Sequence, residues 1–127
     1  MDKISVLLVD DEEELSLVLA ERLQMRDYDA EGVMSAEAAL ERIKEKTFKV
    51  IVIDIKMPGT GGLELMRKIK QQYPHTRIIL FTGHGSAREG EQGIAEGAFD
   101  YLIKPVKIEN LIKKINDAVT DLDAAGG

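Results

Sequence analysis

The chain has 127 residues, of which 44% are hydrophobic and 31% are charged, a composition typical of one globular domain. It contains no cysteine, which excludes disulfide scaffolds and thiol nucleophiles and agrees with a reducing compartment. The net charge of −6 is the wrong sign for a domain that holds a nucleic-acid backbone. The apolar runs are far shorter than the roughly 20 residues of a membrane span, and no signal peptide is recognisable. We therefore expect a cytoplasmic protein without a direct nucleic-acid or membrane partner.

Apolar runs and stretches with helical spacing alternate along the chain. The first run is rich in β-branched residues and stops at acids, which is typical of a buried strand with a charged end. The stretch after it repeats apolar residues at helical spacing and predicts a helix with one apolar face. In chain order we predict a strand over residues 4–9, a helix to about 25, a weaker strand over 28–33, a helix from 35, a strand over 49–53, a helix from 63 to about 73, a strand over 77–81, a weak helix over about 86–96, a strand over 99–103 and a helix from 108.

Five predicted strands alternate with five predicted helices, and the connections between them are short. Parallel strands joined through helices bury both faces of their sheet, which accounts for the nearly continuous apolar runs. We therefore expect an α/β fold with a doubly wound parallel sheet and helices on both faces. We place the domain at residues 1–122, followed by a flexible tail over residues 123–127.

Charged and hydroxyl side chains follow four of the predicted strands. In an open parallel sheet, ligands bind outside the carboxyl ends of the strands. Two carboxylates about 4 Å apart repel by roughly 4 kcal/mol at an effective dielectric of 20, so three converging acids need a cation, for which Mg²⁺ is the natural candidate. A lysine there suits an anionic ligand oxygen. These strand ends carry Asp10 and Asp11, Asp54, Thr82, and Lys104.

Each of these residues also has a structural interpretation. Asp11 stands before a helix and could be its N-cap, and Asp54 could cap the next helix, although the proline and glycine cluster at 57–62 intervenes. Thr82 and Lys104, taken singly, would be ordinary loop residues. Their joint placement at the ends of the strands favours one common site.

Four motifs in fixed order resemble the receiver domain of two-component response regulators, and the resemblance covers roughly residues 3–122. The run at 97–101 is similar to receivers attached to sigma-54-type activators. The four motifs are Val9-Asp10-Asp11-Glu12, Asp54-Ile55-Lys56-Met57-Pro58-Gly59, Thr82-Gly83 and Lys104-Pro105.

The resemblance implies a flavodoxin-like fold with strand order 2-1-3-4-5. It implies that Asp54 accepts a phosphoryl group from the phosphohistidine of a sensor histidine kinase or a histidine phosphotransfer protein. Mg²⁺, with Mn²⁺ as a substitute, would be held by Asp10, Asp11, Asp54 and the backbone carbonyl of Lys56.

The resemblance also implies a switch. The hydroxyl of Thr82 would bond the new phosphoryl group together with Lys104, and the ring of Tyr101 would turn inward, changing the face formed by the last two helices and the last strand. This face would control an output domain, a partner or a receiver homodimer.

Other positions take supporting roles in the family. The bond before Pro105 is usually cis in relatives and would direct Lys104 into the site. Gly83 would leave the phosphoryl group accessible. Lys56 and His84 occupy positions that tune dephosphorylation, although a loop histidine is also commonly just solvated.

The predicted helix near residues 86–96 departs from the family pattern. It contains Gly90 and Gly93, each of which costs about 1 kcal/mol relative to alanine, and Glu91 stands where relatives often have an apolar residue. We expect this helix to be marginal and partly disordered before phosphorylation.

Several alternatives remain open at this point. The chain could be a stand-alone receiver, a phosphorelay carrier or the N-terminal module of a longer regulator. A flavin- or nucleotide-binding module of the same fold would need a glycine- or hydroxyl-rich loop after the first strand, where this chain has acids. A phosphatase of the haloacid dehalogenase type would carry its second acid two residues after the nucleophile, and a receiver that no longer accepts phosphate would lack key residues.

Overall fold

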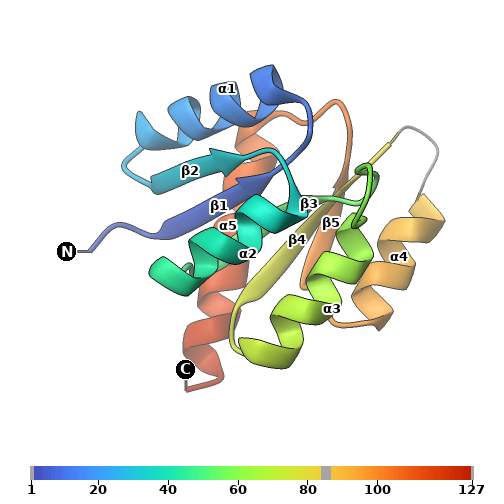
Figure 1. Cartoon of the computed structure of the whole chain (residues 1–127). Helices are drawn as coiled ribbons and strands as arrows, with labels where there is room; N and C mark the ends of the chain where they lie inside the picture. Colours follow the sequence, from blue (N-terminus) through green and yellow to red (C-terminus); the bar gives the residue numbers. More distant parts are fainter. Residues whose placement is uncertain (1, 84–86, 127) are drawn as a thin grey trace.

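The computed structural model describes residues 2–83 and 87–126. Strands and helices alternate along this part of the chain, as the sequence predicts (Figure 1). In chain order they are β1 (Ser5–Val9), α1 (Glu13–Gln24), β2 (Asp29–Val33), α2 (Ala36–Glu45), β3 (Val50–Asp54), α3 (Gly62–Gln72), β4 (Arg77–Thr82), α4 (Ala87–Ala95), β5 (Asp100–Ile103) and α5 (Ile108–Ala124).

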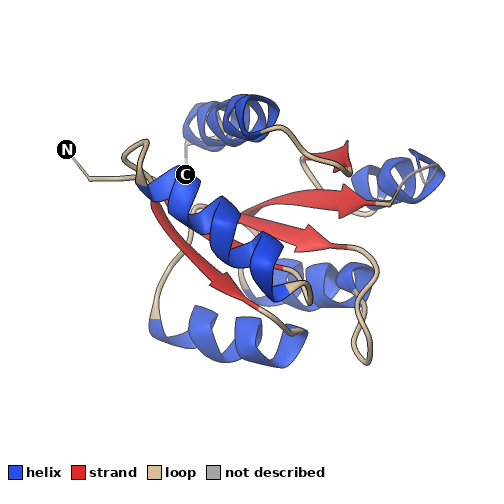
Figure 2. Ribbon diagram, turned by 90° about the horizontal axis from the view of Figure 1, so that it is seen from above, coloured by secondary structure: helices blue, strands red, loops and turns tan. Residues whose placement is uncertain are grey.

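The strands form a single parallel sheet in the order β2-β1-β3-β4-β5, which confirms the predicted topology. Seen from above, helices lie on both sides of this sheet (Figure 2). The chain crosses from one side of β1 to the other between β2 and β3, so the carboxyl ends of β1 and β3 become neighbours at the point where the strand order reverses. That point is where an open parallel sheet offers a crevice for a ligand.

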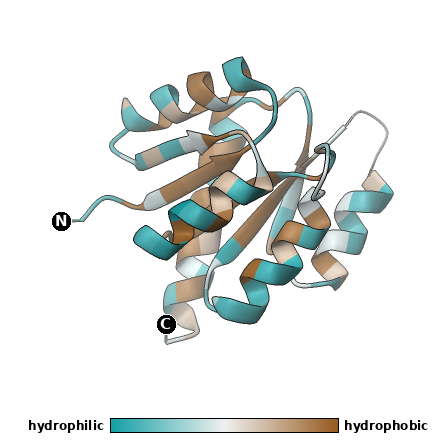
Figure 3. Ribbon diagram, viewed as in Figure 1, coloured by the Kyte–Doolittle hydropathy of each residue, from teal (hydrophilic) through white to brown (hydrophobic). Residues whose placement is uncertain are grey.

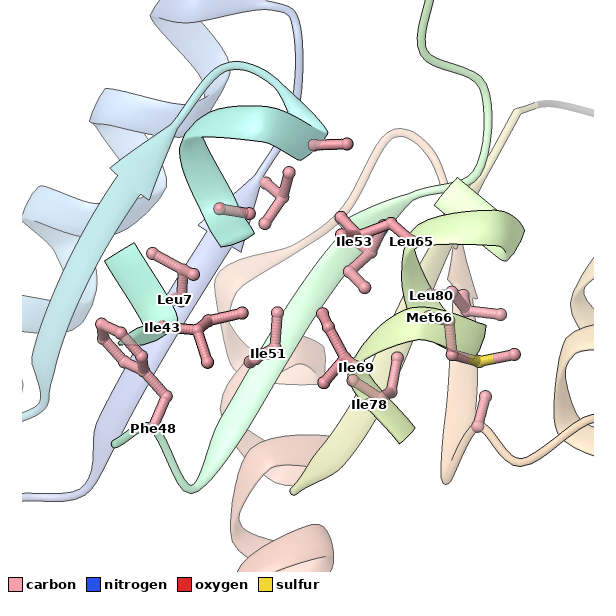
Figure 4. Close-up of a cluster of buried hydrophobic side chains, with 14 of the residues drawn as sticks. Leu7, Ile43, Phe48, Ile51, Ile53, Leu65, Met66, Ile69, Ile78 and Leu80 are labelled. Atoms are coloured by element: carbon pink, nitrogen blue, oxygen red, sulfur yellow. The ribbon is translucent and has the colours of Figure 1, made fainter. Parts of the chain in front are cut away.

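Alternate strand residues pack on opposite faces of the sheet. Leu7 and Val9 face the cluster that α2 and α3 cover, and Val6 and Leu8 face the cluster that α1 and α5 cover. Figure 4 shows the first cluster, and Figure 3 shows hydrophobic residues in the central strands with hydrophilic residues on the outer helix surfaces. Burial on both faces explains why the sequences of the central strands β1, β3 and β4 are mostly apolar.

The element boundaries differ from the predicted ones at functionally relevant places. Asp54 and Thr82 are the last residues of β3 and β4 rather than the first residues after them. The helix α5 continues to Ala124, so the predicted boundary between domain and tail at residue 122 falls inside a helix. Of the described helices, none combines the length and the apolar character that a bilayer crossing requires.

The helix α4 is formed in spite of its two glycines. Gly90 and Gly93 are its buried residues, and they face β5 and β4. The glycines therefore have a packing role, because they allow the helix to lie close to the sheet. The start expected near residue 86 falls outside the described residues.

We expect α4 to open more easily than α5. Each internal glycine costs about 1 kcal/mol relative to alanine, and α4 has 9 residues where α5 has 17. In native-state hydrogen exchange of the unphosphorylated protein, the amides of α4 should exchange faster than those of α5. Equal protection of the two helices would show that α4 is not marginal.

Candidate functional site

Three carboxylates converge at the carboxyl edge of the sheet. Asp10 directly follows β1 and Asp54 ends β3, and the two strands are paired in register. Asp10 and Asp54 are buried, with exposed fractions of 2% and 6%, whereas Asp11 is exposed. One oxygen from each of the three carboxyl groups lies within 4.8 Å of the others. The acids that the sequence places on separate strands thus form one cluster.

Lys104 brings a positive charge into this cluster. Its Nζ lies 2.9 Å from Oδ2 of Asp10 and 3.3 Å from Oδ2 of Asp54. The Lys104–Pro105 peptide bond is cis, as the resemblance to the receiver family implies, and the backbone N–H of Lys104 donates to the carbonyl of Thr82. One lysine therefore faces both buried carboxylates.

Burial and charge shift the proton affinities of the site. Burial, followed by the charge of Asp10, raises the pKa of Asp54 to about 6, although Lys104 acts in the opposite direction. Burial alone would lower the pKa of Lys104, but its close ionic contacts with Asp10 and Asp54 outweigh burial and raise that pKa. Two buried anions sharing one cation leave the site short of positive charge.

The donor set fits a divalent metal with oxygen ligands. Oδ2 of Asp10 is buried and accepts no hydrogen bond within the described part of the chain, even though Nζ of Lys104 is close to it. Its other oxygen accepts from the backbone N–H of Glu12 at 2.9 Å. An unsatisfied buried carboxylate oxygen beside two further carboxylates suits Mg²⁺, which prefers such hard oxygen ligands.

The hydroxyl of Thr82 lies at the same edge. Thr82 is 1% exposed, and its Oγ1 is 3.4 Å from the carbonyl oxygen of Gly83, at the long limit for a hydrogen bond. Among the described residues, a Cβ on Gly83 would have no neighbour within 4 Å.

The remaining predicted residues lie around the cluster. The backbone N–H of Lys56 donates to Oδ1 of Asp54 at 3.2 Å, while its exposed ammonium group is 3.7 Å from Glu89 on α4. Tyr101 is half-buried on β5, in register with Leu80 of β4, and its ring lies against α4 rather than in the acidic cluster. His84 falls outside the described residues.

Two residues near the site had no assigned role in the sequence analysis. Oε1 of Glu12 lies 3.3 Å from Nζ of Lys104. The only sequence feature that points to Glu12 is its place in the run of three acids after β1. Gly62 begins α3 so close to β3 that a Cβ there would lie 2.2 Å from the backbone oxygen of Asp54. No sequence pattern reveals the second contact, because it depends on how α3 meets the sheet.

The fold and this site define the class of the protein. It is a doubly wound α/β domain with an acidic pocket, one lysine and one buried threonine at the carboxyl edge of the sheet. The family model described as the response regulator receiver domain matches residues 6–116. The chain therefore belongs to the receiver-domain family of two-component response regulators, as its motifs indicate.

Individual relatives and solved structures agree with this membership. The response regulator FleR of Pseudomonas aeruginosa is 35% identical over 84% of this chain and 23% of its own length. The C4-dicarboxylate transport regulatory protein DctD of Rhizobium meliloti is 33% identical over 90% of this chain and 25% of its own. This chain thus spans only a part of these regulators. Together with the NtrX-like regulators of Rickettsia, they agree with the expected sigma-54-associated type.

Solved structures resemble the chain closely. A receiver domain protein from Clostridium thermocellum superposes with a TM-score of 0.90 at 30% identity, over 96% of this chain and 98% of that one. NtrX from Brucella abortus superposes with a TM-score of 0.93 at 27% identity, over 97% of this chain and 28% of that one. The receiver fold is therefore shared along nearly the whole chain.

We expect Gly62→Ala to destabilise the domain. The added Cβ would meet backbone atoms of Asp54 and Ile55, which cannot move aside without distorting the end of β3. Urea unfolding should show a loss of about 1–3 kcal/mol in the free energy of unfolding. Gly61→Ala is the matched control, because its Cβ would lie at an ordinary 3.7 Å from Ile55, and it should cost less than about 1 kcal/mol. Equal losses in both variants would contradict the close approach of α3.

We expect Asp54→Asn to stabilise the metal-free domain near pH 7.5 but much less near pH 4. The pKa of Asp54 is about 6 in the folded protein and near 3.8 when unfolded, so the folded state binds more protons between these values. Wild-type stability therefore falls as pH rises through this window, by roughly 1–3 kcal/mol relative to the variant. The measurement is urea unfolding at several pH values with EDTA. Asp123→Asn, at an exposed position of α5, is the control. A constant difference between Asp54→Asn and wild type across pH would contradict the raised pKa.

Proposed function

We propose that this domain is a phosphorylation-activated signalling switch in which Asp54 accepts a phosphoryl group from the phosphohistidine of a sensor histidine kinase or a histidine phosphotransfer protein. The observation that carries the proposal is the position of Asp54. Its carboxylate is buried at the carboxyl edge of the sheet, beside Asp10 and 3.3 Å from the ammonium group of Lys104. Membership of the receiver family supports the same assignment.

The proposed reaction is a phosphoryl transfer from nitrogen to oxygen. A bond forms between phosphorus and a carboxylate oxygen of Asp54 as the bond from phosphorus to the donor histidine breaks, and the imidazole leaves with the electron pair. The nucleophile must be ionised, and a pKa of about 6 leaves Asp54 mostly ionised at neutral pH. Beyond the nucleophile, the protein forms no covalent bond in this step, so positioning and electrostatic stabilisation supply the catalysis.

Three groups of this chain would meet the phosphoryl oxygens or the nucleophile. The ammonium group of Lys104 would exchange its carboxylate partners for a phosphoryl oxygen. The hydroxyl of Thr82 is engaged only at 3.4 Å and is free to donate to the same group. The backbone N–H of Lys56 already donates to Oδ1 of Asp54 and fixes its orientation.

A divalent cation would complete the site. Asp10, Asp11, Asp54 and the backbone carbonyl of Lys56 would hold Mg²⁺, with Mn²⁺ as a substitute, which accounts for the buried oxygen of Asp10 that lacks a hydrogen-bond partner. When bound, such a metal supplies positive charge that neutralises the carboxylates and the oxygens of the transferred group.

The output would be a change in the face formed by α4, β5 and α5. Movement of Thr82 toward the phosphoryl group would allow the ring of Tyr101 to turn inward and bias this face between two states. The face would then engage an output domain or a second receiver, since related regulators extend well beyond the matched region. Lys56 and His84 would adjust how quickly water removes the phosphoryl group through the opening at Gly83.

We expect acetyl phosphate with Mg²⁺ to phosphorylate the protein at Asp54. Intact-mass measurement under conditions that preserve acyl phosphates should show the gain of one phosphoryl group. The gain should disappear in Asp54→Asn and without Mg²⁺, because the nucleophile or the balancing charge is then missing. Asp123→Asn, which changes a carboxylate far along α5, should be labelled as the wild type is.

Labelling that persists in Asp54→Asn would place the acceptor elsewhere. If acetyl phosphate fails, the same experiment with a phosphorylated histidine phosphotransfer protein decides the matter. Failure with both donors would contradict the proposed function.

A further inference from the structure

The inner side of α4 touches Tyr101 without any intervening side chain. A Cβ on Gly90 would lie 2.4 Å from both Cγ and Cδ2 of the Tyr101 ring and 2.8 Å from Cδ1. Real side chains essentially never approach so closely. The base of the ring therefore lies directly on the backbone of α4, in a space that only glycine leaves open.

A second glycine makes a different contact one turn later. A Cβ on Gly93 would lie 2.1 Å from Cδ1 of Leu80, the residue of β4 that stands in register with Tyr101. Cδ1 is the far end of a flexible side chain and can move aside. The atoms that face Gly90 belong to the base of a rigid ring, so they can yield only if the whole ring rotates or the helix moves away.

The helix α4 packs on the sheet through its two buried residues, Gly90 and Gly93. Within α4, only the two glycines are buried, while Ile94 is 40% exposed and Ile103 on β5 is 41% exposed. Surface ion pairs connect Glu89 of α4 with Lys56, and Glu96 just after α4 with Arg67, and such pairs contribute little to stability. The position of the helix therefore depends strongly on the ring beneath it.

We propose that Gly90 is a positioning residue that couples the orientation of the Tyr101 ring to the position of α4. With no side chain between ring and helix, rotation of the ring away from α4 leaves a gap that the helix must fill by moving, because packed interiors do not tolerate voids. The regulatory meaning of this coupling rests on the proposed function, whereas the contact between Gly90 and the ring of Tyr101 is independent of it.

The contact is tested by a double-mutant cycle with Gly90→Ala and Tyr101→Ala, measured by thermal unfolding. In the presence of Tyr101, Gly90→Ala should lower the melting temperature by a few degrees although alanine favours helices. In the Tyr101→Ala background the same change should raise it. Gly93→Ala is the matched control, since it faces Leu80, and its effect should be the same in both backgrounds.

The cycle has a clear negative outcome. If Gly90→Ala raises the melting temperature in both backgrounds, the ring does not constrain the helix and the proposal is overturned. Tyr101→Leu serves as the second background if Tyr101→Ala fails to fold, and it should abolish the penalty of Gly90→Ala in the same way.

The regulatory part is tested on samples treated with acetyl phosphate and Mg²⁺. Intact mass reports the phosphorylation of Asp54, and hydrogen exchange reports the response of α4. Gly90→Ala should be phosphorylated to the wild-type extent but lose at least half of the phosphorylation-induced change in α4, whereas Gly93→Ala should retain most of it. Normal phosphorylation with an unchanged α4 response in Gly90→Ala would overturn the coupling. If neither acetyl phosphate nor a phosphorylated histidine phosphotransfer protein labels the wild type, the proposed function is overturned, and the regulatory role of Gly90 with it. The melting-temperature cycle would still decide whether the ring of Tyr101 contacts α4 at Gly90.

Discussion

The candidate site of this domain is built around two buried carboxylates held side by side at the carboxyl edge of the sheet. Asp10 and Asp54 are almost inaccessible to solvent, and Lys104 is the cation that faces both. Burial, together with the charge of Asp10, raises the pKa of Asp54. One oxygen of Asp10 has no hydrogen-bond partner among the described residues. A site of this kind favours the arrival of further positive charge, and with it an anionic phosphoryl group.

The parallel sheet makes this crowding possible, and close backbone contacts make it precise. The hydrogen-bonded register of β1 with β3 fixes the spacing between the two acids, and the strands cannot slip without moving apolar side chains out of both cores. Gly62 then allows α3 to begin directly against the backbone of Asp54. Gly90 plays a comparable part at the other end of the site, where α4 lies on the ring of Tyr101. Glycine thus brings a helix to the sheet both at the proposed acceptor and at the proposed output face.

Much of the fold and most of the site could be predicted from the sequence because both follow from local patterns. Continuous apolar runs identify strands buried on both faces, and acids placed directly after such runs must lie at one edge of a parallel sheet. The prediction was less accurate at the ends of elements, where Asp54 and Thr82 belong to their strands and α5 extends to Ala124. Strand and helix ends depend on single hydrogen bonds, which hydrophobic patterns do not report. The pairing of Glu12 with Lys104 joins residues 92 positions apart, and no local pattern could indicate it.

Periodicity and residue chemistry are properties of neighbours along the chain, and they predict the class of the fold and the strand ends that carry charge. The role proposed for Asp54 came from the resemblance to the receiver family. Only the tertiary structure decided how those residues meet: that Lys104 lies between Asp10 and Asp54, and that one oxygen of Asp10 is buried without a hydrogen-bond partner among the described residues. The structure also gives the glycines of α4 a packing role. From the sequence alone they only lower the stability of the helix, whereas in the structure Gly90 leaves room for the ring of Tyr101 and Gly93 for Leu80. Distances between groups remote in the chain arise from packing, and packing is set by the whole domain at once.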